Sequence, residues 1–302
     1  MSRSFKTIAL TGKYRDPRVG DSLLILARHL ESAGVRVLLD PAIKMEFPGV
    51  GVETAAAEEI GAATDLVIAV GGDGTMLYAS RMVAGRDVPL LGINRGRLGF
   101  LADITPGEMI RRLDEVLAGD FEEERRLMLE AVIDNGDAPP RRALALNDVV
   151  LQKRDTGRML DFENWIDGVY VNTHGGDGLV IATPTGSTAY ALSGGGPIIH
   201  PSLEAIALVP ICPHTLSDRP IVVRADARIE VRVLQRPDTG AEVSCDGLPL
   251  GELKSGQRLL VAAAEERVVL IHPRGHDYFR LLRSKLHWGR GSQSRFDGGA
   301  DG

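Results

Sequence analysis

A glycine-rich turn that follows an apolar run is the first place where the residue types of this chain suggest chemistry. The sequence Gly-Gly-Asp-Gly-Thr at residues 71–75 comes directly after residues 66–70, whose Val and Ile content is typical of a strand buried on both faces. Glycine lets a backbone approach a ligand closely, and a helix expected over residues 76–83 would point free N–H groups at an anion. A carboxylate beside phosphates is electrostatically unfavourable, so Asp73 should have another task. The first hypothesis is that Asp73 abstracts a proton.

The turn at residues 71–75 does not match the common nucleotide-binding motifs. No Lys follows in the frame that a P-loop requires, and the pattern is not Gly-x-Gly-x-x-Gly, so a dehydrogenase is poorly supported. The composition does fit a phosphate-binding nest of backbone N–H groups. The alternative without a ligand is a tight turn in which Asp73 begins a helix.

A run rich in hydroxyl side chains is the second segment that suggests a ligand. Thr-Pro-Thr-Gly-Ser-Thr-Ala-Tyr at residues 183–190 is followed by Ser-Gly-Gly-Gly-Pro at residues 193–197, after an apolar strand and before a short helical stretch. Ser and Thr favour helix caps, but one cap needs one hydroxyl. Capping leaves three further hydroxyls and the glycine run unexplained, so we expect this segment to contact a ligand.

Other polar positions have both a functional and a structural interpretation. Asn147 and Asp148 interrupt an apolar run, where polar side chains need partners, although a bulge or a strand-end turn would also place them there. Asp177 lies between two glycines and fits either a ligand contact or a hairpin turn. The Asp-Gly pair at residues 246–247 lies between extended runs and favours a hairpin turn.

Strand and helix patterns alternate in the first third of the chain, which predicts a doubly wound parallel sheet. Ligands bind beyond the C-terminal strand ends of such sheets, and residues 71–75 lie at such an end. Thr105 with Pro106 and Glu108 is a helix start signal. The expected strands are residues 8–10, 35–39, 66–70 and 88–93. The expected helices are residues 21–33, 76–83 and 105–117, and Gly34 would stop the first of them. A loop is expected over residues 41–52.

The pattern changes near Gly119, after which short extended runs separated by turn residues predict an all-β domain. A closing helix over residues 276–288 would return to the first domain, and the Gly-, Ser- and Asp-rich end is typical of a disordered tail. The expected domains are a Rossmann-like α/β domain over 1–120 plus 275–290, a β-sandwich-like domain over 121–274, and a tail over 291–302. The expected strands of the β-sandwich-like domain are residues 128–133, 143–152, 169–172, 179–182, 221–223, 229–234, 241–244, 258–262 and 268–271.

Bulk composition sets the class of protein. The 302 residues are enough for two domains, and 44% hydrophobic with 25% charged residues is ordinary for a soluble globular protein. A net charge of −6 argues against binding to nucleic acids or lipid surfaces, and no apolar run approaches the roughly 20 residues of a membrane span. Because the N-terminus has no signal-peptide core, the expected location is the cytoplasm.

Cysteine and histidine offer no recognisable site in the sequence. Cys212 and Cys245 form no disulfide framework and no zinc spacing, and Cys245 is interpreted as a core thiol because no matching Cys–His pattern is present. The histidines, including His272 and His276, are judged to lack metal-ligand spacing and receive no catalytic role. No protein-held metal site is therefore predicted.

Taken together, the motifs at residues 71–75 and 183–190 resemble those of bacterial-type NAD kinases. The turn at 71–75 alone is shared with diacylglycerol-type lipid kinases and resembles the phosphofructokinase loop, so the run at 183–190 is the specific part. The resemblance spans roughly residues 5–290. Further similarity lies at residues 92–94, 98–101, 147–148, 195–198, 210–216 and 219–220.

This resemblance implies an activity, a quaternary structure and a set of site residues. The implied reaction moves a phosphoryl group from ATP to the 2′-hydroxyl of the adenosine ribose of NAD, in a homotetramer or homodimer, at a dinucleotide site between the two domains. Many members have Glu where this chain has Asp148, so its contact would be weaker or water-bridged. Asp73 matches the catalytic aspartate; the implied NAD-binding residues are Asp73, Gly74, Phe100, Asn147, Asp148, Asp177, Thr188, Ala189, Tyr190 and Ser193, and the implied phosphate-donor loop is Gly71, Gly72, Gly74 and Thr75.

The expected mechanism needs a base and charge neutralisation. A ribose hydroxyl is a poor nucleophile near neutral pH, so a carboxylate within about 2.6–3.2 Å would accept its proton as the attack develops. A divalent cation, expected to be Mg²⁺, would be bound with the nucleotide because no acidic pair forms a protein cage. Inorganic polyphosphate is an alternative donor. The competing functions are a lipid kinase, which would need an apolar groove, and a non-catalytic dinucleotide sensor.

Overall fold

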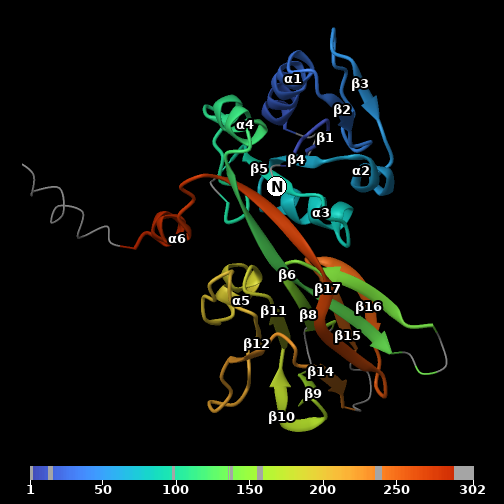
Figure 1. The fold of residues 1–302 in the computed structure, drawn as a ribbon. Helices are drawn as coiled ribbons and strands as arrows, with labels where there is room; N and C mark the ends of the chain where they lie inside the picture. Colours follow the sequence, from blue (N-terminus) through green and yellow to red (C-terminus); the bar gives the residue numbers. More distant parts are fainter. Residues whose placement is uncertain are drawn as a thin grey trace, which may run out of the picture. The chain divides into compact units, whose positions relative to one another are not determined.

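The structure, a computed structural model, describes residues 3–12, 16–96, 99–134, 136, 139–154, 159–234 and 240–288. The chain forms two compact units (Figure 1). The first unit comprises Met1–Met76, Leu90–Glu123 and Ile271–Gly302, and the second comprises Leu77–Pro89 and Glu124–Leu270. The tail expected over residues 291–302 lies outside the described residues, as does Leu98.

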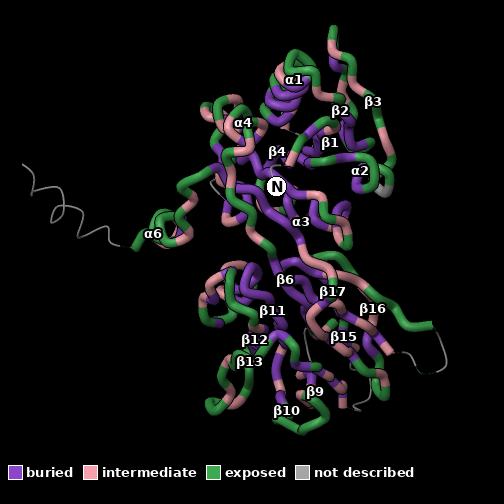
Figure 2. Tube along the Cα trace, viewed as in Figure 1, coloured by how far each residue is buried: buried purple, intermediate pink, exposed green. Residues whose placement is uncertain are grey.

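A parallel sheet forms the centre of the first unit, with strand order β5-β4-β1-β2-β3. Residues of β4 are buried along its whole length (Figure 2), which is why this strand reads as a continuous apolar run. The strands are β1 (Thr7–Gly12), β2 (Arg36–Leu39), β3 (Val52–Thr54), β4 (Leu66–Gly71) and β5 (Leu90–Asn94); the helices are α1 (Pro17–Ser32), α2 (Ala57–Ala63), α4 (Met109–Leu117) and α6 (Tyr278–Leu286). Helix α3 (Asp73–Val83) begins in the first unit, and its residues from Leu77 onward belong to the second.

Helix α1 shows how the sequence sets these elements. The Asp16 side chain accepts a hydrogen bond from the Arg18 N–H, and Pro17 occupies the first helical position. One face buries Leu23, Leu26 and Leu30 among other residues. Gly34 follows with a φ of +75°, a left-handed conformation that glycine adopts without strain, so the helix stops where the sequence predicted.

Two β-sheets share one apolar core in the second unit. The first has the order β13-β12-β11-β8-β15-β16, and in the other β10, β9, β14 and β17 pair in turn, with β6 joining β17 to β7. The core takes side chains from both sheets, such as Val149 of β8 and Phe162 of β9, as in a sandwich. The strands are β6 (Phe121–Asp134), β7 (Arg141–Ala145), β8 (Asp148–Lys153), β9 (Leu160–Ile166), β10 (Val169–Gly176), β11 (Gly178–Ala182), β12 (Ala205–Ile211), β13 (Ile221–Arg224), β14 (Ile229–Val233), β15 (Ala241–Cys245), β16 (Leu248–Leu253) and β17 (Arg258–Pro273).

The predicted fold class, α/β plus all-β with a closing helix in the first unit, is confirmed, whereas several element boundaries are wrong. The helix expected from Thr105 begins at Met109, because the Thr105 hydroxyl bonds the Glu108 carboxylate in a turn that precedes it. Helix α2 and strands β3, β9, β12 and β16 were not predicted. The two runs at 258–262 and 268–271 are one strand, β17. None of the described helices has the length and apolar character to cross a membrane.

Candidate active site

Asp73 is the first residue of α3, directly after the end of β4. Its Oδ2 accepts a hydrogen bond from the Phe100 N–H at 2.9 Å, and its Oδ1 accepts one from the Leu101 N–H at 3.0 Å. An ionised carboxylate offers about four lone-pair positions, so these two bonds orient the group and leave acceptor capacity on both oxygens. Half-buried Asp73 is therefore a fixed carboxylate that can still accept a proton.

Two glycines of the first unit are required by close packing around Asp73. A Cβ at Gly99 would lie 1.9 Å from Asp73 Oδ1, and a Cβ at Gly71 would lie 2.2 Å from Thr75 Oγ1. By contrast, a Cβ at Gly72 or Gly74 would meet nothing within 4 Å. No atom of the described residues explains why Gly72 and Gly74 lack side chains, which fits a backbone that a ligand approaches at a helix N-terminus.

Phe100, expected in the wall of the site, is half-buried in the first unit. Lys285 of α6 places its Nζ 5.4 Å from the centre of the Phe100 ring, within the range of a cation–π contact. The closing helix thus contacts a predicted site residue.

In the second unit, Asp246 organises the Asn147–Asp148 turn. Its carboxylate accepts hydrogen bonds from the backbone N–H groups of Leu146 at 2.9 Å, Asn147 at 2.8 Å and Asp148 at 3.2 Å, and its side chain is completely buried. The hairpin turn predicted at residues 246–247 is confirmed between β15 and β16, but its sequence gave no sign that the aspartate holds a segment about 100 residues away. Asn147 lies between β7 and β8, so the strand-end alternative is correct.

The hydroxyl-rich run packs directly on this turn. The Thr183 N–H donates to the Asn147 carbonyl at 2.9 Å, and the Thr183 hydroxyl donates to the Leu146 carbonyl at 2.6 Å. Gly186 is also required here, because a Cβ would lie 2.0 Å from the Asn147 carbonyl oxygen. Two segments singled out separately in the sequence, 147–148 and 183–190, therefore form one half-site with Asp246 beneath them.

The structure corrects the argument from the hydroxyl count, because each hydroxyl has a partner inside the protein. Ser187 donates to the Pro184 carbonyl at 2.6 Å and accepts from the Ile199 N–H at 2.9 Å. Thr188 donates to the Thr185 carbonyl at 3.2 Å, and Thr185 accepts from Arg126 at 3.2 Å. Local folding thus explains the hydroxyls left over from capping. Residues 183–187 are buried, Thr188 and Ala189 are half-buried, and Tyr190 is exposed.

The remaining predicted residues fall into two places in the second unit. Thr188, Ala189, Tyr190 and Ser193 follow one another through a 3₁₀ turn (Gly186–Thr188) and helix α5 (Tyr190–Ser193). Asp177 lies at the opposite end of β11, since Ala182 pairs with Asp148 but Gly178 pairs with Gln152. At about 3.4 Å per residue, roughly 15 Å separate the two ends. Asp177 forms an ion pair with Lys153, and because its flanking strands lie in different sheets it is not a hairpin turn.

Burial changes the acidity of this half-site. Burial first, and the neighbouring charge of Asp246 second, raise the pKa of Asp148 to about 7. Burial also raises the pKa of Asp246 above its ordinary value, against the opposing effect of its three backbone hydrogen bonds. The pKa of the buried Cys245 thiol rises to about 12, chiefly through burial, so the prediction of an inert core thiol fits.

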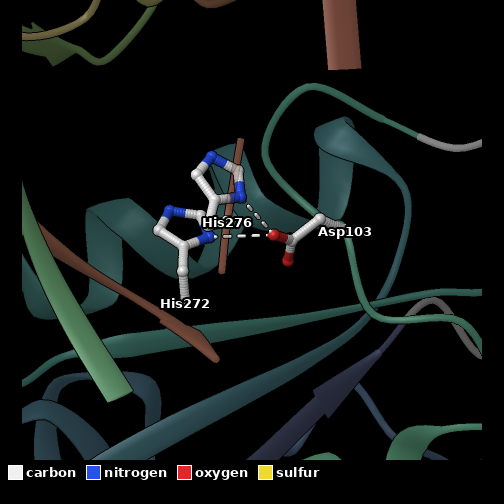
Figure 3. Close-up of side chains that lie close together, drawn as sticks. All are labelled: Asp103, His272 and His276. Carbon is white, nitrogen blue, oxygen red and sulfur yellow. Dashed lines mark hydrogen bonds and ion pairs between the residues drawn. The ribbon is translucent and has the colours of Figure 1, made fainter. Parts of the chain in front are cut away.

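The sequence showed no metal-ligand spacing among the histidines, but the structure brings His272 and His276 together with a third group. Their rings and the Asp103 carboxylate converge in the first unit (Figure 3). Spacing along the chain failed as a guide because the third group lies 169 residues away in sequence from His272. Among the described residues, this is the one cluster of His, Cys, Asp or Glu side chains close enough to hold an ion, and its imidazoles do not suit Mg²⁺.

Comparisons with known proteins agree on one family. Models of the ATP-NAD kinase N-terminal and C-terminal domains match residues 24–121 and 146–273. An NAD kinase of Nitrosococcus oceani is 44% identical over 96% of this chain and 99% of that protein, and one of Chromohalobacter salexigens is 46% identical over 94% and 97%. Yeast NADH kinase complexed with NADH aligns with a TM-score of 0.87 at 26% identity, covering 95% of this chain and 89% of that one. An Archaeoglobus fulgidus NAD kinase in complex with ATP gives 0.72 at 28%, covering 93% and 98%.

Proposed function

The chain belongs to the ATP-NAD kinase family and catalyses the ATP-dependent phosphorylation of NAD, and we propose that Asp73 is the general base of this reaction. The acceptor would be the 2′-hydroxyl of the adenosine ribose. The observation that supports this role is the fixed carboxylate: two backbone N–H groups hold Asp73, and acceptor capacity is left on both oxygens. A base that is already oriented loses no rotamer freedom as the hydroxyl attacks.

We also propose how the site residues divide the substrates. The loop of Gly71, Gly72, Gly74 and Thr75 would receive the donor phosphates, with Thr75 contributing its hydroxyl rather than its backbone N–H, which donates to the Gly72 carbonyl at 2.9 Å. Phe100 would bound the site. The turn at Asn147 and Asp148, the residues Thr188 to Tyr190 and Ser193 would bind the dinucleotide. Asp177 lies at the far end of β11, so within one chain it would contact a different part of NAD from Asn147.

A divalent cation, which we propose to be Mg²⁺, would arrive with the nucleotide. Mg²⁺ prefers oxygen ligands, and the one three-residue cluster among the described residues contains two imidazoles, so the phosphates are the better ligands. When bound there, the cation would neutralise phosphate charge. A homotetramer or homodimer and a cytoplasmic location are part of this proposal, and light scattering of the purified protein would measure the assembly.

The variant Asp73→Asn tests the proposed base. It keeps the size of the side chain and removes its basicity, so we expect the turnover of ATP and NAD into phosphorylated product to fall at least about 100-fold. NAD affinity, measured by calorimetry, should change much less. A folded variant that binds NAD and keeps more than about a tenth of the wild-type turnover would show that Asp73 is not the base.

A second pair of variants tests the orientation of the Asp73 carboxylate while Asp73 itself is kept. Gly99→Ala places a methyl group where Asp73 Oδ1 lies, so the carboxylate must rotate and turnover should fall at least about 10-fold. Gly96→Ala is the matched control, since a Cβ there meets nothing within 4 Å. Equal turnover in both variants would contradict the importance of carboxylate orientation.

A further inference from the structure

Asp103, His272 and His276 form a compact cluster that the proposed kinase reaction does not use. Asp103 Oδ2 lies 3.1 Å from Nδ1 of His272 and 2.7 Å from Nδ1 of His276 (Figure 3). All three residues belong to the first unit: Asp103 lies between β5 and α4, His272 near the end of β17, and His276 just before α6. The imidazole rings stack with their centres 4.0 Å apart.

We propose that this cluster is a binding site for a divalent transition-metal ion of the Zn²⁺ class, held by the Asp103 carboxylate and Nδ1 of both imidazoles. Two nitrogens and one carboxylate oxygen are a donor set that Zn²⁺ favours over Mg²⁺ or Ca²⁺. The inference concerns three residues that have no part in the proposed base mechanism, and it does not depend on the proposed base.

The positions of the three donor atoms are close to those of a tetrahedral site. Metal–ligand distances of about 2.0–2.2 Å put neighbouring ligands about 3.3–3.5 Å apart. The two distances from Asp103 Oδ2, 3.1 and 2.7 Å, need to increase by less than 1 Å, and all three donor atoms lie within 4.8 Å of one another. An ion among the three atoms would replace the two hydrogen bonds with three coordinate bonds.

The short segment between the histidines produces this geometry. Pro273, Arg274 and Gly275 separate them, and Gly275 has a φ of +84°, which favours glycine. The resulting turn reverses the chain between β17 and α6, so that the second imidazole lies over the first. The two histidines, four residues apart, are thus brought together by a turn and not by a helix.

The cluster offers one carboxylate oxygen and two imidazole nitrogens to an ion. Nδ1 of His272 and Nδ1 of His276 both face Oδ2 of Asp103. An imidazole nitrogen binds a metal only in its unprotonated form, so we expect metal affinity to rise with pH.

There is room for a further ligand. Asp103 and His276 line a cavity of about 350 Å³, which is large enough for several water molecules. Two other acids in its lining are already engaged, since Glu108 bonds Arg111 and Asp277 caps α6. Water is therefore the expected fourth ligand. Nε2 of His276 is buried without a hydrogen-bond partner among the described residues, so no neighbouring group holds the ring in place from its far side. Such a bond is worth about 10–100-fold in metal affinity, and we therefore expect micromolar rather than nanomolar binding.

The test is a metal titration of the purified full-length protein without nucleotide. After treatment with a chelator and desalting, Zn²⁺ is titrated against a chromophoric competitor, and Co²⁺ is added separately to record its visible absorption. We expect one Zn²⁺ per chain, a rise in the thermal midpoint and the intense Co²⁺ bands of a four-coordinate site. His276→Gln and Asp103→Asn should each lower the affinity at least about 10-fold.

His214→Gln is the matched control, because it removes an exposed histidine of the second unit and should bind Zn²⁺ like the wild type. Circular dichroism of each variant separates a lost ligand from a lost fold. The proposal is overturned if wild-type Zn²⁺ binding is no tighter than that of folded His276→Gln or Asp103→Asn, or if His214→Gln loses as much. Kinase activity enters none of these measurements, so the proposed base can fail without affecting this result.

Discussion

Asp148 is a buried carboxyl group that changes its charge near neutral pH, because burial and the charge of Asp246 raise its pKa to about 7. In the unfolded chain the same group titrates near 3.9. Between these two values the folded protein binds more protons than the unfolded one, so this group lowers stability as the pH rises from about 4 to about 7. The charged form also meets the buried thiol of Cys245, whose pKa it helps to raise.

The variant Asp148→Asn should therefore be less sensitive to this pH change than the wild type. A carboxyl group that is protonated in the folded protein and ionised in the unfolded chain lowers the free energy of unfolding by up to about 1.4 kcal/mol per pH unit between its two pKa values. Thermal midpoints at pH 5 and pH 7.5 measure the difference, and the wild type should lose more stability than the variant on going to the higher pH. Asp226→Asn, at an exposed position, should match the wild type. Identical pH profiles for all three proteins would refute the raised pKa.

At the level of single residues, the sequence identified side chains that stand in a recognisable motif and missed those that act on them. Asp73 could be predicted from residues 71–75 alone. Gly99 could not, because its importance depends on a carboxylate 26 positions earlier that the fold brings within 1.9 Å of its missing Cβ. Asp246 was interpreted correctly as a turn residue, yet its three backbone partners lie about 100 residues away.

The hairpin turns of the second unit show that one local structure can serve two purposes. Asp167 and Asp246 have φ values of +51° and +49°, and each precedes a left-handed glycine. Asp167 accepts a single backbone bond, from the Arg228 N–H at 2.9 Å, whereas Asp246 accepts three and is completely buried. Arg81 of α3 adds a long ion pair of 3.9 Å to Asp246. The turn between β15 and β16 therefore also fixes the turn between β7 and β8.

We expect Asp246→Asn to damage the half-site more than Asp167→Asn. The NH₂ group of the Asn side chain would take the place of one carboxylate oxygen and face a backbone N–H that now donates to Asp246. Both of these buried donors would be unpaired, at a cost of about 1–3 kcal/mol. The KM for NAD should rise and the thermal midpoint should fall, while Asp167→Asn, with the same backbone conformation, should stay near the wild type. A smaller effect at Asp246 than at Asp167 would refute this role.

Among the elements, periodicity predicted the strongly patterned segments and failed where tertiary contacts decide. The central parallel strands β4 and β5 of the first unit are continuous apolar runs, and their pattern was sufficient, whereas the edge strand β3, with its exposed Glu53 and Thr54, was missed. Strand β9 places the polar side chain of Asn164 on the same buried face as Phe162, so its sequence carried a mixed pattern. The hydroxyls of residues 183–190 were expected to contact a ligand because capping could not account for them, and the structure gives them partners inside the protein that the sequence did not reveal, such as the Leu146 and Pro184 carbonyls.

The whole molecule is built from units that are discontinuous in sequence. The first unit needs residues from both ends of the chain, and its last described helix, α6, buries Leu281 and Leu282. Helix α6 begins with Asp277, whose side chain accepts from the Arg280 N–H at 3.0 Å. The C-terminal segment is therefore part of the first unit's packing rather than an appendage.

Leu282→Ala should consequently destabilise the protein. Removing a buried leucine costs about 2–5 kcal/mol, which corresponds to a thermal midpoint lower by several degrees. Phe279→Ala in the same helix is the control, because Phe279 is 57% exposed and its truncation should cost much less. Differential scanning calorimetry measures both variants. Equal losses at the two positions would indicate that α6 does not pack through Leu282.

The split of the first unit across the sequence has a consequence for protein synthesis. Ile271 belongs to the apolar core that also contains Leu10 and Ile68, but it leaves the ribosome last of the three. At about 5–20 residues per second, the roughly 150 residues between the second and third parts of this unit take roughly 8–30 s to translate. For that time the nascent first unit lacks part of its core and keeps apolar surface uncovered. Translational pauses within residues 124–270 should lengthen the interval in which chaperones or aggregation compete for this surface.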